Sequence, residues 1–68
     1  MTDRAKSMLE QQIDETMKMK LTDYERAFCE GLVGGYMASN EDDEVALRVA
    51  YELARVRMRV REREEVKP

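Results

Sequence analysis

The side chains of this sequence that could do chemistry are carboxylates, arginines, three tyrosines and one cysteine, and there is no histidine. The chain therefore lacks the usual acid–base group near neutral pH and the commonest metal ligand. Neighbouring carboxylates occur at Asp14–Glu15 and Asp42–Asp43, but consecutive residues of a helix point apart. The sequence has no phosphate-binding glycine motif, calcium-loop spacing or nucleophile motif. We expect no catalytic residue, no metal site, no cofactor and no enzymatic activity.

Tyrosines and arginines are the residues best suited to contact a ligand or partner. Tyrosine combines an aromatic face with a polar tip, and arginine pairs with anionic groups. The candidate contacts are Tyr24, Tyr36, Tyr51, Arg55, Arg57, Arg59, Arg61 and Arg63. They suit a protein partner or a small anionic ligand held between subunits. The alternative is a nucleic-acid-binding regulator that grips phosphates with its arginine-rich end.

Cys29 is the single cysteine and lies among apolar residues, where a thiol usually serves as a small hydrophobic side chain. One cysteine cannot form a disulfide within the chain, and such usage is typical of a reducing compartment. The first residues are polar and charged, so we expect no signal peptide. The longest apolar run is far shorter than the ~20 residues that span a bilayer. These features predict a cytoplasmic protein that does not bind a membrane.

The elements that must position these side chains are three predicted helices, at residues of about 2–20, 22–38 and 41–64. Apolar residues recur at steps of three and four in the first, with Thr2 as the expected cap. No linker is expected before the second helix, where Thr22 and Glu25 have the spacing of a capping box. Ser39 or Asn40 is the expected cap of the third helix. The predicted fold is a small all-α, three-helix subunit, with residues 1–68 as one domain whose last few residues fray.

The predicted second helix carries a bulky ridge next to a row of small residues. The ridge consists of Tyr24, Phe28, Leu32 and Tyr36, which recur at every fourth position. Gly31 and Gly35 lie beside it, and each glycine costs a helix about 1 kcal/mol relative to alanine. Close approach of another helix is the expected compensation. The alternative is that Gly34 and Gly35 kink or end the helix.

The predicted third helix has a heptad seam and a polarised charge distribution. Its seam consists of Ala46, Val49, Leu53, Val56 and Val60, with a second apolar line beside it. Residues 41–44 are all acidic and arginines dominate residues 55–63, so two antiparallel copies would bring opposite charges together. Residues 55–61 also alternate strictly, which leaves an intersubunit strand as an alternative to a helix. Acidic residues in the first turn of the third helix would be repelled by DNA phosphates, which argues against a DNA-binding helix-turn-helix motif.

A chain of 68 residues buries only about 60% of its unfolded surface, so we expect oligomerisation to complete the fold. The predicted self-association residues are Gly31, Gly35, Phe28, Leu32, Val49, Leu53, Val56 and Val60. Small size, helical character and missing catalytic groups are typical of small inhibitors, such as phage-encoded ones, and of bacterial regulatory adaptors. The sequence therefore predicts a non-enzymatic helical binding protein that acts as a homodimer or larger homo-oligomer.

Overall fold

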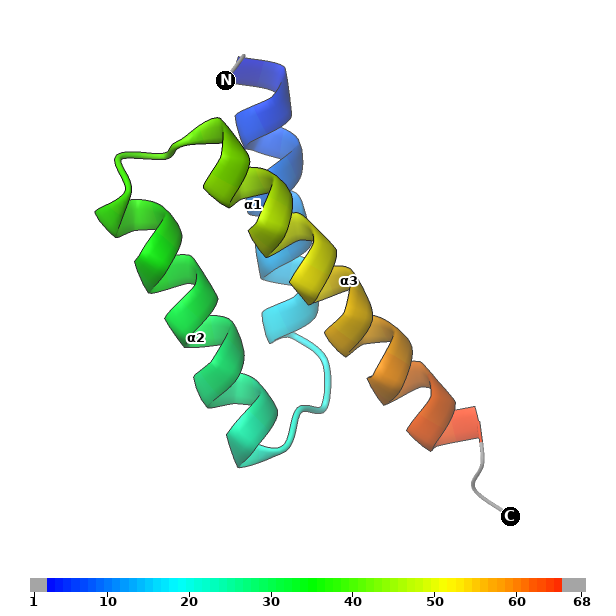
Figure 1. The fold of residues 1–68 in the computed structure, drawn as a ribbon. Helices are drawn as coiled ribbons and strands as arrows, with labels where there is room; N and C mark the ends of the chain where they lie inside the picture. The colour runs from blue at the N-terminus through cyan, green and yellow to red at the C-terminus, as the bar shows by residue number, and fades with distance from the viewer. Residues whose placement is uncertain (1–2, 66–68) are drawn as a thin grey trace.

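In the computed structural model, which describes residues 3–65, the chain forms three helices that run in alternating directions (Figure 1). Helix α1 spans Asp3–Met17, α2 spans Asp23–Ala38 and α3 spans Asp43–Glu65. α3 packs against both other helices, which contact one another much less. No strand occurs within residues 3–65. The predicted all-α, three-helix fold is confirmed, including a helix rather than a strand at residues 55–61. Completion by oligomerisation stays a prediction.

Helix α2 begins at the predicted capping box. The Thr22 hydroxyl accepts a hydrogen bond from the Glu25 amide at 3.0 Å, and Glu25 Oε1 accepts one from the Thr22 amide at 2.9 Å. Thr22 itself has extended backbone geometry, with φ −70° and ψ 165°. The helix then continues through Gly34 and Gly35 to Ala38. The predicted continuous helix is confirmed, and the alternative that it ends at the glycines is wrong.

The first helix is shorter than predicted, because α1 ends at Met17 rather than near Lys20. The Met19 amide donates to the Thr16 carbonyl at 3.1 Å, and the Leu21 amide donates to the Met19 carbonyl at 2.9 Å. These short-range bonds replace the α-helical pattern and close the helix end. Residues 18–22 form a loop, so the prediction that no linker separates the first two helices is wrong. The predicted cap at Thr2 lies outside the described residues.

Helix α2 ends in a Schellman motif. The Glu41 amide donates to the Tyr36 carbonyl and the Asn40 amide donates to the Met37 carbonyl, each at 3.2 Å. Asn40 and Glu41 both have positive φ, at 59° and 60°. Asparagine tolerates this left-handed conformation better than most residues, and the two hydrogen bonds satisfy carbonyls that the helix end leaves free. Asn40 therefore ends α2.

Helix α3 begins later than predicted, at Asp43, and its cap is Asp42. The Asp42 carboxylate accepts a hydrogen bond from the Val45 amide at 3.3 Å, which is the usual geometry of a capping aspartate. The predicted cap at Ser39 or Asn40 is wrong. Asn40 is used by the Schellman motif, and the Ser39 hydroxyl instead donates to the Tyr36 carbonyl at 2.7 Å.

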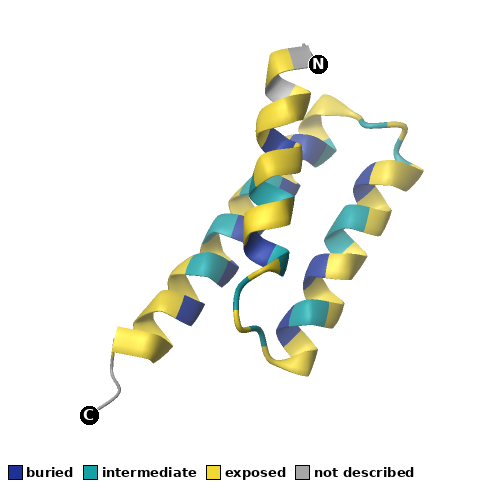
Figure 2. Ribbon diagram, turned by 180° about the vertical axis from the view of Figure 1, so that it is seen from behind, coloured by how far each residue is buried: buried dark blue, intermediate teal, exposed yellow. Residues whose placement is uncertain are grey.

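The core is one apolar cluster between the three helices, and the buried residues face this centre (Figure 2). α3 supplies most of it, and Leu53 and Val60 have no exposed surface. The cluster consists of Leu9 from α1, Cys29 and Tyr36 from α2, and Ala46, Val49, Leu53, Val56 and Val60 from α3. The heptad seam of α3 is therefore used within the subunit.

Candidate binding site

Helix α2 has one side that packs on the rest of the chain and one side that does not. On the packed side Glu25, Cys29 and Tyr36 are buried. On the other side the Tyr24 side chain is well exposed and Phe28 is partly exposed. Residues at positions i, i+4, i+7 and i+11 share one face of a helix. The residues at these positions are Tyr24, Phe28, Gly31 and Gly35, which we call the open side of α2.

The glycines of α2 have open space in front of them. A Cβ atom added at Gly31, Gly34 or Gly35 would meet no heavy atom within 4 Å beyond the neighbouring turns of its own helix. All three residues are exposed. Close helix packing within the subunit therefore does not explain them, although each lowers helix stability by about 1 kcal/mol relative to alanine. The compensation predicted from the sequence is not found inside a single chain.

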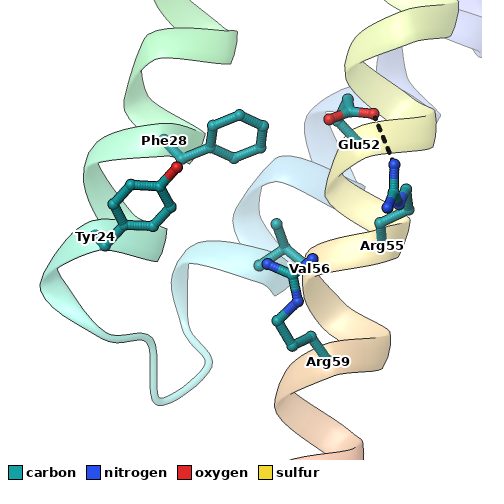
Figure 3. A pocket seen from close by; sticks show the side chains of 6 residues that line it. All are labelled: Tyr24, Phe28, Glu52, Arg55, Val56 and Arg59. Carbon is teal, nitrogen blue, oxygen red and sulfur yellow. Dashed lines mark ion pairs between the residues drawn. The ribbon is translucent and has the colours of Figure 1, made fainter.

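A pocket of about 190 Å³ lies between the open side of α2 and helix α3 (Figure 3). Tyr24 and Phe28 form its α2 wall, and the Phe28 ring points toward α3. The α3 wall consists of Glu52, Arg55, Val56 and Arg59. Val56 is 4% exposed and belongs to the core cluster, so it links the pocket to the interior. The pocket combines an apolar base with two aromatic rings and two cations.

The two pocket arginines are weakly held by the rest of the chain. Arg55 Nη1 lies 3.8 Å from Glu52 Oε1, and the Arg55 guanidinium carbon lies 5.8 Å from the centre of the Tyr51 ring. An exposed ion pair of this kind contributes only about 0–1 kcal/mol. Arg59 makes no hydrogen bond or ion pair with any of the described residues. Both guanidinium groups can therefore pair with an anionic group that enters the pocket.

The packed side of α2 holds a polar cluster of a different kind: Thr22, Glu25 and Arg63. We call it the buried clamp after its carboxylate, because Glu25 is buried while Thr22 and Arg63 are exposed. Arg63 of α3 donates from both terminal nitrogens to the Glu25 carboxylate, each at 3.0 Å. Its Nη2 also donates to the Lys20 carbonyl at 3.2 Å. The Arg63 hydrogen bond, followed by the Thr22 amide, lowers the pKa of Glu25 from 4.5 to about 2. Glu25 is thus an ionised structural group at neutral pH rather than a proton acceptor.

A second arginine of α3 is also engaged within the fold. The fully buried Thr16 hydroxyl donates to the Gln12 carbonyl at 2.7 Å and accepts from Arg57 Nη1 at 2.9 Å. This contact joins the end of α1 to the middle of α3. Arg57 therefore connects two helices of the subunit.

The five arginines predicted as contacts do not share one surface. Arg55 and Arg59 line the pocket, Arg57 and Arg63 bind groups within the chain, and Arg61 is exposed. The reason is geometric, because each residue advances about 100° around an α-helix and alternating residues spread apart. A strand would have placed four of them on one face, but this segment is helical.

The tyrosines predicted as contacts lie in three different environments. Tyr24 lines the pocket, and Tyr51 is 62% exposed on α3 next to Arg55. Tyr36 is buried in the core, and its hydroxyl finds no hydrogen-bond partner among the described residues. Tyr36 therefore serves packing, and only Tyr24 and Tyr51 present aromatic surface to a partner.

The predicted self-association residues divide between the core and the open side. Phe28 and the glycines lie on the open side of α2, and Leu32 is partly buried against the core. The remaining members are buried in the core of the single chain: Val49, Leu53, Val56 and Val60. A second copy could reach the second apolar line of α3, where the exposed residues are Leu47, Tyr51 and Met58.

Sequence reasoning named Arg55, Arg59 and Arg63 as candidate contacts but missed Glu52 in the pocket wall and the pairing of Arg63 with Glu25. One signal was present, because Glu25 precedes Cys29 by four residues and therefore shares its buried face. A buried carboxylate needs a cation, but no local pattern identifies Arg63 as that cation, since it lies 38 residues away in sequence. A similar separation in sequence hides the fact that Glu52 lines one pocket with Tyr24 and Phe28.

Three further findings bear on what the chain can do. Within residues 3–65 no cluster of three or more side chains is arranged to bind a metal ion. None of the described helices is long and apolar enough to cross a membrane. Cys29 has no exposed surface, and burial raises the pKa of its thiol. The candidate site considered for this chain is the open side of α2 with its pocket.

Comparison of the chain with protein-family models, with curated proteins and with solved structures gives no match. Function must therefore be argued from the geometry of this site and from the charges around it.

Proposed function

We propose that this chain is a non-enzymatic binding protein that receives a helix of a protein partner on the open side of α2. The observation that carries the proposal is the row of exposed glycines beside exposed aromatic rings. The glycines weaken α2, and the exposed rings add little to the core of the subunit. A docked helix would approach closely at Gly31 and Gly35 and would cover Tyr24 and Phe28. Helices that lie in an apolar groove are a recurring mode of recognition.

The dimensions of the site favour a helix over a small free ligand. The pocket holds about 190 Å³, whereas sites for drug-sized ligands typically occupy about 300–1,000 Å³. The open side also extends beyond the pocket, because Tyr24 and Gly35 are separated by about 16 Å along the helix axis. A side chain fits the pocket, and the rest of a helix fits the glycine row. Of the two partners expected from the sequence, the protein partner is therefore the better supported.

The test is to fill the space in front of the glycines without disturbing the fold. Leucine is a far better helix former than glycine, so Gly31→Leu/Gly35→Leu should fold at least as well as the parent chain while blocking a docking helix. Gly34→Leu is the matched control, because Gly34 projects about 100° away from Gly35 and about 60° away from Gly31 around the helix. Affinity purification with quantitative mass spectrometry should recover a protein with the parent chain and the control, but not with the double variant. Equal recovery with all three chains would contradict the proposal.

Self-association remains part of the proposed function and has its own surface. Leu47, Tyr51 and Met58 lie on one side of α3 and are 73%, 62% and 58% exposed. Their spacing, i, i+4 and i+11, is that of a helix-pairing stripe. Sedimentation equilibrium should give a species heavier than the 8.0 kDa chain, and Leu47→Glu/Met58→Glu should return it to the monomer mass. A monomer at all concentrations and at both low and high salt would remove self-association from the proposal.

The alternative function, nucleic-acid binding, receives weaker support from the arrangement of the arginines. Arg57 and Arg63 are engaged within the chain, so only part of the arginine-rich segment can reach phosphates. The alternative predicts a gel shift at low salt that fades steeply as salt is added, because phosphate contacts release counterions. No shift at low salt would eliminate it.

A further inference from the structure

The chemistry of the α2–α3 pocket points to a particular kind of partner. One wall is aromatic, with Tyr24 and Phe28, and the other carries Arg55 and Arg59 beside the single carboxylate of Glu52. Arg48 and Glu62 continue the same side of α3, since they lie seven residues before and after Arg55, which is two helical turns. The pocket wall itself presents two guanidinium groups against one carboxylate. Its positive charge lies directly beside the apolar row that a docked helix would cover.

The pocket arginines are poorly satisfied when compared with the arginines elsewhere on α3. Arg63 makes two hydrogen bonds to a carboxylate at 3.0 Å, and Arg57 makes one to a hydroxyl at 2.9 Å. In contrast, Arg55 has one carboxylate contact at 3.8 Å and Arg59 has none among the described residues. A carboxylate between Arg55 and Arg59 would give both guanidinium groups the type of bond that Arg63 already has.

We infer that the occupant of the open side is an acidic amphipathic helix of another protein. This inference rests on the proposed function and names the partner's chemistry. The apolar face of the helix covers Tyr24, Phe28 and the glycine row. An aspartate or glutamate at the edge of that face enters the pocket and pairs with Arg55 and Arg59. Complementary charge of this kind fixes the orientation of the docked helix and speeds its association.

A second copy of this chain is a poorer occupant of the same site. The exposed apolar stripe that a copy offers is Leu47, Tyr51 and Met58. On that helix Glu44 and Glu52 flank the stripe together with Arg48 and Arg55, so the copy offers the pocket arginines no net negative charge. A helix with acidic residues along both edges complements these arginines better. The two apolar surfaces thus serve different partners, a foreign helix on α2 and a second copy on α3.

The experiment uses two lactam-bridged synthetic helices of about four turns that carry the same leucine stripe. One helix has glutamates along the edges of the stripe and the other has glutamines at the same positions. Each is titrated into the ¹⁵N-labelled full chain, and affinity and amide shifts are followed by NMR. We expect shifts centred on Tyr24, Phe28 and Val56, with the glutamate helix binding at least about tenfold tighter at low salt.

Arginine variants test which residues cause the preference for the glutamate helix over the glutamine helix. Arg55→Gln/Arg59→Gln should remove the preference for the glutamate helix, whereas Arg61→Gln should keep it, because Arg61 is exposed but lies outside the pocket. Equal affinity for both helices, or a preference that survives the double variant, would overturn the inference.

The outcomes also separate this inference from the proposed function. If both helices bind equally and Gly31→Leu/Gly35→Leu abolishes both, the docking face stands and the acidic partner is wrong. The inference fails and the proposed function stands if neither synthetic helix binds, while affinity purification still recovers a protein with the parent chain but not with Gly31→Leu/Gly35→Leu. If a mixed-sequence DNA duplex shifts the same amides and the glutamate helix does not, the arginines serve phosphates and the inference is overturned.

Discussion

The two sides of helix α2 contribute differently to the folded subunit. Tyr24 and Glu25 are neighbours in sequence, yet Tyr24 is 76% exposed and Glu25 only 4%. Glu25 is held by Thr22 and Arg63, and its neighbours on that side fill the core. The open side adds no comparable contact and includes glycines that weaken the helix. The packed side therefore accounts for folding, and the proposed contact outside the subunit uses the open side.

The largest expected difference is between two tyrosines of the same helix. Truncating a buried aromatic side chain costs about 3–5 kcal/mol, and the whole stability of a chain this size is about 3–10 kcal/mol. Tyr36→Ala should therefore leave much of the chain unfolded at 25 °C. Tyr24→Ala should change the free energy of unfolding by less than about 0.5 kcal/mol, as surface substitutions usually do. Thermal and urea unfolding followed by circular dichroism measure both, and equal losses would erase the distinction between the two sides.

The next effect comes from the buried clamp. Glu25→Gln removes the charge from hydrogen bonds with Arg63 and Thr22, and hydrogen bonds to charged groups are worth about 1.5–3 kcal/mol. We expect a loss of that size in urea unfolding. Arg63→Gln should also destabilise the chain, and a double-mutant cycle should show strong coupling between the two positions. Lys18→Gln is the control, because the Lys18–Asp14 ion pair is well exposed. Additive single effects in the cycle would mean that the clamp does not act as a unit.

The clamp also predicts how stability depends on pH. The pKa of Glu25 falls from 4.5 to about 2 on folding, so the folded chain holds the ionised carboxylate more strongly than the unfolded chain does. Its contribution is fully present above about pH 5 and is lost as the pH falls toward 2. Urea unfolding between pH 7 and pH 2 should show this loss, and Arg63→Gln should reduce the slope. An NMR titration midpoint of Glu25 near 4.5 in the folded chain would contradict the assignment.

The sequence predicted the helices well because the local signals were strong. The capping box at Thr22 and Glu25 and the apolar periodicity of α3 each depend on residues close together in the chain. The helix ends were predicted less well, because competing local bonds decide them. Asn40 suits both a helix start and a left-handed helix end, and only the hydrogen bonds of the Schellman motif settle which role it takes.

The candidate site was predicted only in part, because it is built from two helices. The sequence predicted that Gly31, Gly35 and Phe28 meet another helix, and the structure places them on the open side of α2. It could not foresee that the heptad seam of α3 would be buried within the subunit, because a seam looks the same whether its partner is inside or outside the chain. The division of the arginines among Thr16, Glu25 and the pocket likewise depends on helix packing.

The smallest expected effects come from substitutions of the glycines. These substitutions test the difference between the packed side and the open side of α2 most directly. Alanine at Gly31, Gly34 or Gly35 meets open space, so each substitution should raise the free energy of unfolding by about 0.5–1 kcal/mol. The three gains should add to within about 0.5 kcal/mol, because none of the added methyl groups touches another part of the chain. Urea unfolding of the three single variants and the triple variant measures this. A loss of stability at Gly31 or Gly35, but not at Gly34, would mean that the folded protein already packs another helix there, which for the pure chain could only be a second copy.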